Sequence, residues 1–167
     1  MSEVVKHDFE TSIIERIEEG IIDLLKSGLS SAFYIAAFPD DPRNFDSAKM
    51  KAAALVHFAG SRYGLDGNGN PASQTRDLRF TIQLYLHNLR DHDGGYVTIE
   101  KTRKALQNRS VAGSTPIRMV SEDLADQTNG QWTWQLDIAC TVPAVAQVVN
   151  RQPIPRSPIN QFQQTGN

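Results

Sequence analysis

Residues 78–86 read Leu-Arg-Phe-Thr-Ile-Gln-Leu-Tyr-Leu, and this stretch decides the fold class. Its large apolar side chains alternate with other residues, which predicts a strand with one face on the core and one polar face. An earlier run, Ala53–Ala59, is mostly apolar and predicts a second, central strand. Between the two runs, Ser61–Thr75 is rich in glycine and asparagine, a composition that favours turns. We therefore expect a long loop there, and loops of that length in compact domains are usually functional or flexible.

Three further runs complete the predicted sheet. They are Phe33–Phe38, which Pro39 ends; the weaker strand Ile117–Leu124; and, after the tight-turn signal Asn129-Gly130, the alternating run Trp132–Cys140. Two helices interrupt the strands, so that the order of elements is α-β-β-β-α-β-β. Hairpin-type links favour an α+β fold: a mostly antiparallel sheet of four to five strands, packed with two main helices on one face, plus an extended C-terminal arm.

The first predicted helix has an apolar stripe at spacings of three and four residues, formed by Ile13, Ile17, Ile21, Leu24 and Leu25. Ser12 and Glu15 fit a capping box, although a start near Asp8 is an alternative, and Gly28 is a candidate C-terminal stop.

The second predicted helix spans Tyr96–Leu106. Asp91 or Asp93 is the expected cap at its N-terminus. The residues expected on its buried side are Val97, Ile99, Thr102, Ala105 and Leu106.

The domain organisation follows from length and from a change of composition. The chain has 167 residues, enough for one domain with a real core, and we assign residues 1–142 to that domain. Residues 143–167 are rich in proline and glutamine and carry Arg151 and Arg156 without an acidic side chain. This extension is either a free tail or an arm that orders on a neighbouring subunit through Ile154, Ile159 and Phe162.

Composition excludes several classes of function. A net charge of −2 and a pI of about 6.1 do not predict nucleic-acid binding through a basic surface. Cys140 is the only cysteine, so no intramolecular disulfide or cysteine-cluster metal site is possible, and this fits a reducing compartment. No apolar run of membrane-spanning length and no signal peptide is expected.

Three polar groupings have residue types that occur at sites of chemistry. Asp66–Asn70 has the alternate oxygens of a calcium loop, but Pro71 stands where glycine is needed and Asp77 where the bidentate Glu belongs. Asp91-His92-Asp93 has the residue types of a metal or acid–base site, yet three adjacent residues do not easily converge on one ion. His57 lies inside an apolar strand, where we expect a hydrogen-bonded sheet residue.

The remaining motifs do not predict catalysis either. Ser114 and Ser121 lack a nucleophile-elbow context, and the glycines of residues 64–69 are not followed by a phosphate-binding helix start. Trp132 and Trp134 share one side of a strand and are expected to be core or interface anchors. We predict no catalytic, cofactor-binding or metal-binding residues.

Several phrases of the sequence nevertheless follow a family pattern in order and spacing. They are Ala54–Gly64, Arg79–Leu86, Asn88-Leu89-Arg90, the Gly95-Tyr96 start of a helix that ends at Ala105-Leu106, and Gly130–Asp137 with Trp132. Together they resemble the tail-terminator, or tail-completion, proteins of Mu-like phages and prophages over about residues 10–142. The proline- and glutamine-rich extension lies outside that pattern.

The resemblance implies a structural protein of the virion rather than an enzyme. Tail terminators form hexameric rings on the last ring of the tail tube, stop its polymerisation and offer the docking surface for the neck connector. In contractile tails, which the Mu-like resemblance favours, they also hold the sheath. The implied partners are copies of the chain itself, the tube, sheath and neck proteins, and DNA that passes through the lumen without sequence-specific binding. No cofactor and no membrane are implied, and assembly would take place in the host bacterial cytoplasm.

We expect two segments to make protein contacts, the long loop with a tube, sheath or neck partner and the C-terminal extension with a subunit or the sheath. The candidates are Arg62, Tyr63, Leu65, Asn70 and Arg76 in or beside the loop, and Arg151, Ile154, Arg156, Ile159 and Phe162 in the extension. The alternative is that both segments are flexible surface.

Three other functions stay open at this point. A neck or head-completion ring also lacks chemistry. A tail-assembly adaptor or chaperone would bind tail proteins without entering the particle. A hydrolase or metal enzyme would use His92 with Asp91 and Asp93.

Overall fold

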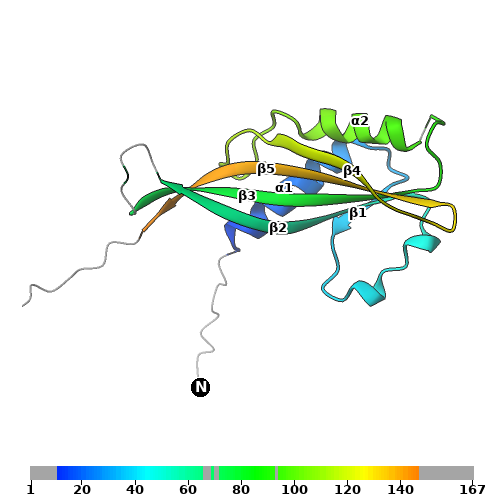
Figure 1. The fold of residues 1–167 in the computed structure, drawn as a ribbon, viewed down its shortest axis with the longest axis horizontal. Helices are drawn as coiled ribbons and strands as arrows, with labels where there is room; N and C mark the ends of the chain where they lie inside the picture. Colours follow the sequence, from blue (N-terminus) through cyan, green and yellow to red (C-terminus); the bar gives the residue numbers. More distant parts are fainter. Residues whose placement is uncertain (1–10, 66–68, 70–71, 93, 147–167) are drawn as a thin grey trace, which may run out of the picture.

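The chain folds into one sheet with two helices, as the computed structural model describes it for residues 11–65, 69, 72–92 and 94–146 (Figure 1). The elements are α1 Ile13–Gly28, β1 Tyr34–Ala37, the short 3-10 turns Pro42–Asn44 and Ser47–Lys49, β2 Ala53–Leu65, β3 Ser73–Leu86, α2 Gly95–Leu106, β4 Arg118–Thr128 and β5 Gln131–Val145. The strand order is β1-β2-β3-β5-β4, with β1 parallel to β2 and every other neighbouring pair antiparallel. The predicted α+β class and order of elements are confirmed.

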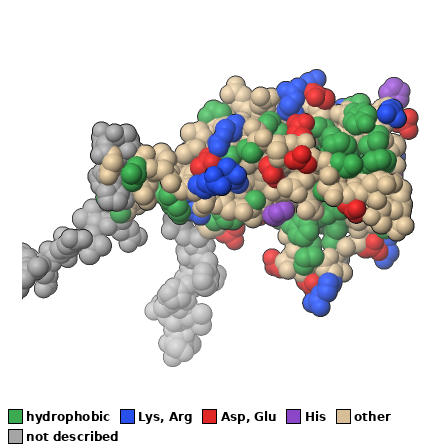
Figure 2. Space-filling view, in the orientation of Figure 1, with side chains coloured by type: hydrophobic (Ala, Val, Ile, Leu, Met, Phe, Trp, Pro, Cys, Tyr) green, Lys and Arg blue, Asp and Glu red, His purple; other side chains and the backbone are tan. Residues whose placement is uncertain are grey.

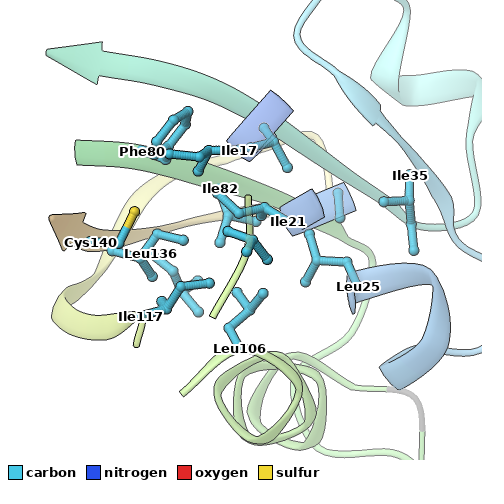
Figure 3. Packing of buried hydrophobic residues seen from close by; sticks show 14 of the residues in the cluster. Ile17, Ile21, Leu25, Ile35, Phe80, Ile82, Leu106, Ile117, Leu136 and Cys140 are labelled. Atoms are coloured by element: carbon cyan, nitrogen blue, oxygen red, sulfur yellow. The ribbon is translucent and has the colours of Figure 1, made fainter. Parts of the chain in front are cut away.

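The core lies between the helices and one face of the sheet (Figure 3). The alternation that defined β3 is confirmed residue by residue, because its five apolar side chains, Leu78, Phe80, Ile82, Leu84 and Leu86, are at most 1% exposed. Ile17, Ile21 and Leu25 of α1 pack on them, with Ile99 and Leu106 of α2 and Leu136, Ile138 and Cys140 of β5. Burying each such side chain stabilises the fold by about 1.5–3 kcal/mol, so these elements hold the sheet rigidly.

Helix α1 begins with the predicted capping box. The Ser12 hydroxyl accepts from the Glu15 backbone N–H at 3.2 Å, and the Glu15 carboxylate accepts from the Ser12 N–H at 2.8 Å. The helix therefore starts at Ile13, and Asp8 lies outside the described residues. At the other end Gly28 is the last helical residue, and a Cβ built on it would lie 2.4 Å from the Cβ of Ala105 on α2. Gly28 thus permits close contact between the helices.

Two expectations for α2 are wrong. The predicted burial of Ile99, Thr102 and Leu106 is confirmed, but Val97 is 38% exposed and Thr98 is buried instead. Thr98 lies one turn before Thr102 on the same face of the helix, and its polar side chain concealed that position in the sequence. The N-cap is Gly94 without a side-chain hydrogen bond, so Asp91 does not cap the helix, and Asp93 lies outside the described residues.

The expected loop Ser61–Thr75 is also wrong over most of its length. Strand β2 continues to Leu65 and β3 begins at Ser73, with cross-strand partners from Ser61↔Leu78 to Leu65↔Gln74. A register shift at Phe58/Gly60, where Gly60 has φ 137°, lets the ladder resume after an irregularity. The glycines signalled a turn, but pairing with β3 and then β5 satisfies the backbone as sheet.

The last two strands are longer than expected. Strand β4 reaches Thr128, and β5 runs to Val145, past the position at which the proline- and glutamine-rich segment was expected to begin. Trp134 packs against the rim of the core and Trp132 is also partly buried, which agrees with their predicted anchoring role. Within the described residues, neither helix is long and apolar enough to span a membrane.

Candidate interaction surfaces

A three-stranded projection carries the described part of the predicted loop interface. From here on we use the name arm for this projection alone and the name extension for the predicted C-terminal segment. The arm consists of Ser61–Leu65 of β2, Ser73–Asp77 of β3 and Thr141–Val145 of β5. It extends the sheet beyond the helices (Figure 1). Four predicted interface residues, Arg62, Tyr63, Leu65 and Arg76, are brought together on it, as β-strand rather than loop residues.

The three most exposed large apolar side chains among the described residues lie on the arm. Tyr63 is 57% exposed, Leu65 62% and Val145 73%. Arg76 is fixed beside them, because its Nε donates to Ser61 Oγ at 3.2 Å and its guanidinium lies 5.6 Å from the centre of the Tyr63 ring. Tyrosine and arginine are enriched in protein-binding hot spots, and exposed apolar side chains beside them are typical of an interaction surface.

The other six predicted interface residues lie outside the described part of the chain. They are Asn70, Arg151, Ile154, Arg156, Ile159 and Phe162.

A polar network on the helix-free face ties the root of the arm to β4. Arg118 Nη1 and Nη2 donate to the two carboxylate oxygens of Asp77 at 2.9 and 2.8 Å, and Thr141 Oγ1 donates to Asp77 at 3.2 Å. Hydrogen bonding from Arg118 lowers the pKa of Asp77 below its ordinary value. Arg118 already balances the negative charge of Asp77. The arm surface therefore carries a positive charge from Arg62 and Arg76.

Asp137 is the second centre of this face. It accepts from Thr81 Oγ1 at 2.7 Å, Ser121 Oγ at 3.2 Å and Gln135 Nε2 at 3.2 Å. Ser121 therefore donates its hydroxyl to a carboxylate in a way that holds two strands together. Figure 2, viewed from this side, shows acidic and basic side chains gathered near the middle of the sheet.

His57 does not have the hydrogen bond that we expected. Its ring packs edge-on against Phe38, with centroids 5.5 Å apart, and its buried Nδ1 has no hydrogen-bond partner among the described residues. Burial lowers the pKa of His57, and the nearby Asp137 charge only partly opposes that effect. The prediction of a hydrogen bond for His57 is wrong. The sequence does not show that the ring of Phe38 will contact the imidazole.

Strand β4 is a surface that the sequence analysis missed. Every residue from Glu122 to Thr128 is exposed, and Val120 and Leu124 are 43% and 47% exposed. A strand at the edge of a sheet that packs on helices usually buries one face. The signal was available, because Glu122, Asp123 and Asp126 leave this strand without an apolar face.

The described residues offer little for catalysis or metal binding. Among residues 11–65, 69, 72–92 and 94–146, no group of three or more His, Cys, Asp and Glu side chains is arranged to hold a metal ion. Asp91 and His92 are exposed in the turn before α2. Cys140 is buried in the core, and burial raises the pKa of its thiol, which makes it a poor nucleophile.

Comparison with known proteins identifies the family of this chain. A family model described as Gp37 protein matches residues 21–160. The chain belongs to the Gp37 protein family. The matched residues include the second half of α1, the whole sheet and most of the proline- and glutamine-rich extension. The extension lies outside the pattern on which the sequence resemblance rests.

One solved structure similar to this chain is a chain from the "Virion of native gene transfer agent (GTA) particle". The TM-score is 0.48 at 10% sequence identity, and the alignment covers 81% of this chain and 100% of that chain. The comparison with curated proteins found no match to this sequence.

Proposed function

We propose that this Gp37 family protein is a structural component of a phage-like virion, specifically a tail terminator. In this role, copies of the chain form a ring, hexameric by the sequence resemblance, that caps the tail tube. The ring stops polymerisation of tube and sheath and offers a docking surface to the neck connector. Its place is the tail–neck junction of the virion, after assembly in the bacterial cytoplasm, and DNA passes through its lumen without sequence-specific contacts.

The arm is the observation that carries this proposal. It places Tyr63, Leu65 and Val145 in solvent on a rigid extension of the sheet, an arrangement suited to contact with another protein and costly for a protein that works alone. The three strands of the arm are continuous with the core strands, so a load on the arm is transmitted to the core. Such rigid coupling suits a ring that must hold a tube end.

The chemistry of the surface supports a non-enzymatic role. The polar groups of the helix-free face are joined to one another across strands, as in the Asp77–Arg118 and Asp137 networks, which rigidify the sheet. Residues 143–167, with the interface candidates Arg151, Ile154, Arg156, Ile159 and Phe162, are proposed as an extension that contacts a neighbouring subunit or the sheath.

The test combines oligomeric mass with imaging. The purified chain is measured by sedimentation velocity and mixed with isolated tail tubes for negative-stain microscopy. We expect rings, alone or on tube ends, and shorter tubes when the chain is present during tube polymerisation. A monomer that neither caps nor shortens tubes contradicts the proposal, and rings that bind only neck proteins favour a neck or head-completion ring.

A variant pair makes the test specific for the arm. Tyr63→Ser with Leu65→Ser removes two exposed apolar side chains and should abolish capping with an unchanged circular dichroism spectrum. Val97→Ser, which alters an exposed apolar residue on α2, is the matched control and should cap tubes normally. Capping by the arm variant at the wild-type level would refute the role of the arm. Binding to tail proteins without presence in purified virions would favour an adaptor.

A further inference from the structure

The arm and β4 are exposed at opposite ends of the same sheet. Strand β4 is exposed from Glu122 to Thr128, where Leu124 lies opposite Trp134 and Thr128 opposite Gln131 at the start of β5. The arm contains the far end of β5, where Val142 lies opposite Arg76. Figure 1 shows the arm projecting away from the β4–β5 hairpin.

The exposed end of the arm and the exposed segment Glu122–Thr128 of β4 lie far apart within one chain. Eight residue steps separate Trp134 from Val142 along β5, and at about 3.3 Å per residue this places them roughly 26 Å apart. Both positions belong to one continuous ladder with β3, so Leu65 at the end of the arm cannot fold back onto Leu124 of its own β4.

The two surfaces are complementary in charge and in apolar content. The arm presents Arg62 on the helix-free face and Arg76 on the other face, and its one acidic residue, Asp77, is paired with Arg118. Strand β4 presents three exposed carboxylates, those of Glu122, Asp123 and Asp126.

Apolar side chains accompany the charges on both surfaces. Tyr63 and Leu65, which share one face of the arm, would meet Val120 and Leu124 on β4, and all four are at least 43% exposed. Opposite charges beside apolar side chains select one partner and fix its register.

We propose that the arm of one copy docks on strand β4 of a second copy. This inference rests on the proposed ring and assigns the interface that would build it. The contact is made through side chains, because register shifts at Met119/Ser121 and Leu124/Asp126 make β4 too irregular for a continuous backbone ladder with a new strand. Every copy both donates an arm and accepts one, so the contact is heterologous and closes into a ring when the rotation between copies allows it.

Disulfide trapping tests the contact directly on the full-length chain. Cys140 is buried, so two introduced thiols, Leu65→Cys and Leu124→Cys, are the reactive pair among the described residues. Under mild oxidation we expect the double variant to form a ladder of covalent multimers. Each single variant should form little dimer, because a heterologous contact does not bring two copies of the same residue together.

A matched control measures the background of non-specific disulfide formation. Leu65→Cys with Lys104→Cys has the same number of thiols, but its second thiol lies on exposed α2. We expect at least about tenfold less multimer from this pair than from the β4 pair, the ratio that 1.4 kcal/mol of contact energy produces. Equal ladders from both pairs, or abundant dimer from Leu65→Cys alone, would overturn the proposal.

Charge exchange provides a second test that does not depend on thiols. Arg62→Glu and Asp123→Arg should each lower the multimer yield of the cysteine pair about tenfold, because each places like charges opposite one another. The two changes on one chain, or an equimolar mixture of the two variants, should restore the yield. Lys101→Glu on α2 is the control for a charge reversal elsewhere. Failure of both combinations to restore trapping, with normal circular dichroism, would exclude this pairing of surfaces.

The outcome separates the interface from the proposed function. Rings on tail tubes without specific trapping would leave the terminator role intact and refute the arm–β4 contact. A specific ladder without tube capping would establish the contact and refute the terminator role.

Discussion

The close contact between α1 and α2 gives the sharpest test of the packing. Substitution of Gly28 by alanine would place a methyl group 2.4 Å from the Cβ of Ala105, where ordinary contacts are 3.4–4 Å. Ala105 Cβ is attached to the helix backbone and cannot rotate away, so the helices must separate by about 1 Å or more. Overpacking of this kind costs about 1–3 kcal/mol.

The intrinsic preference of the helix works in the opposite direction. Alanine is favoured over glycine in a helix interior by up to about 1 kcal/mol, and by less at the last residue of α1. We therefore expect Gly28→Ala to lower the free energy of unfolding by about 1–2 kcal/mol. The assay is urea denaturation followed by circular dichroism, at one protein concentration because self-association adds to apparent stability.

A double-mutant cycle isolates the contact from helix propensity. Ala105→Gly removes the opposing methyl group, so it should cost less in the Gly28→Ala background than in the wild type, with a coupling energy of about 1–2 kcal/mol. The difference between Lys104→Gly and Lys104→Ala measures the cost of glycine at an exposed position of α2. A Gly28→Ala variant as stable as the wild type, or a coupling energy near zero, would refute the reasoning.

Three further predictions concern the N-cap and two titrating groups. Ser12→Ala removes the capping box and should lower the free energy of unfolding by about 1 kcal/mol, as urea denaturation would show; no loss would mean that water replaces the cap. Asp77→Asn should reduce the free energy of unfolding at pH 7, but this deficit should shrink as pH falls below 3.8, because the folded-state pKa of Asp77 is lowered by Arg118 and protonation removes its advantage. A deficit independent of pH would contradict that account. Burial lowers the pKa of His57 from 6.5, so wild-type stability should fall as pH drops below that value, and His57→Gln should lack this component in a urea titration.

The sequence specified the centre of the fold well because local patterns and tertiary contacts agree there. The alternation of residues 78–86 predicted both the strand and its buried face, and all five apolar residues of that face are at most 1% exposed. Ser12 and Glu15 predicted the start of α1, because a capping box is a local hydrogen-bonding arrangement.

The strands of the arm were not predicted, because hydrogen bonds to distant strands, rather than local composition, set the conformation of their backbone. Glycines at positions 60 and 64 favour turns, yet their residues pair with β3, which in turn pairs with β5 from the other end of the chain. Local propensity is a weak guide where cross-strand hydrogen bonds are available. Four of the predicted interface residues, Arg62, Tyr63, Leu65 and Arg76, lie together on the arm, and their role in an interface stays a prediction.

The candidate interface shows the same division. The sequence alone determines the residue types of the interface. They are basic and apolar on β2 and β3, and acidic and apolar on β4. Their separation is decided only by the sheet order β1-β2-β3-β5-β4, which puts the arm and the exposed part of β4 at opposite ends of β5. Hydrophobic periodicity fixes which residues are buried, because it acts between neighbours along the chain. The pairing of strands fixes which surfaces remain open, because it acts between residues that the sequence holds far apart.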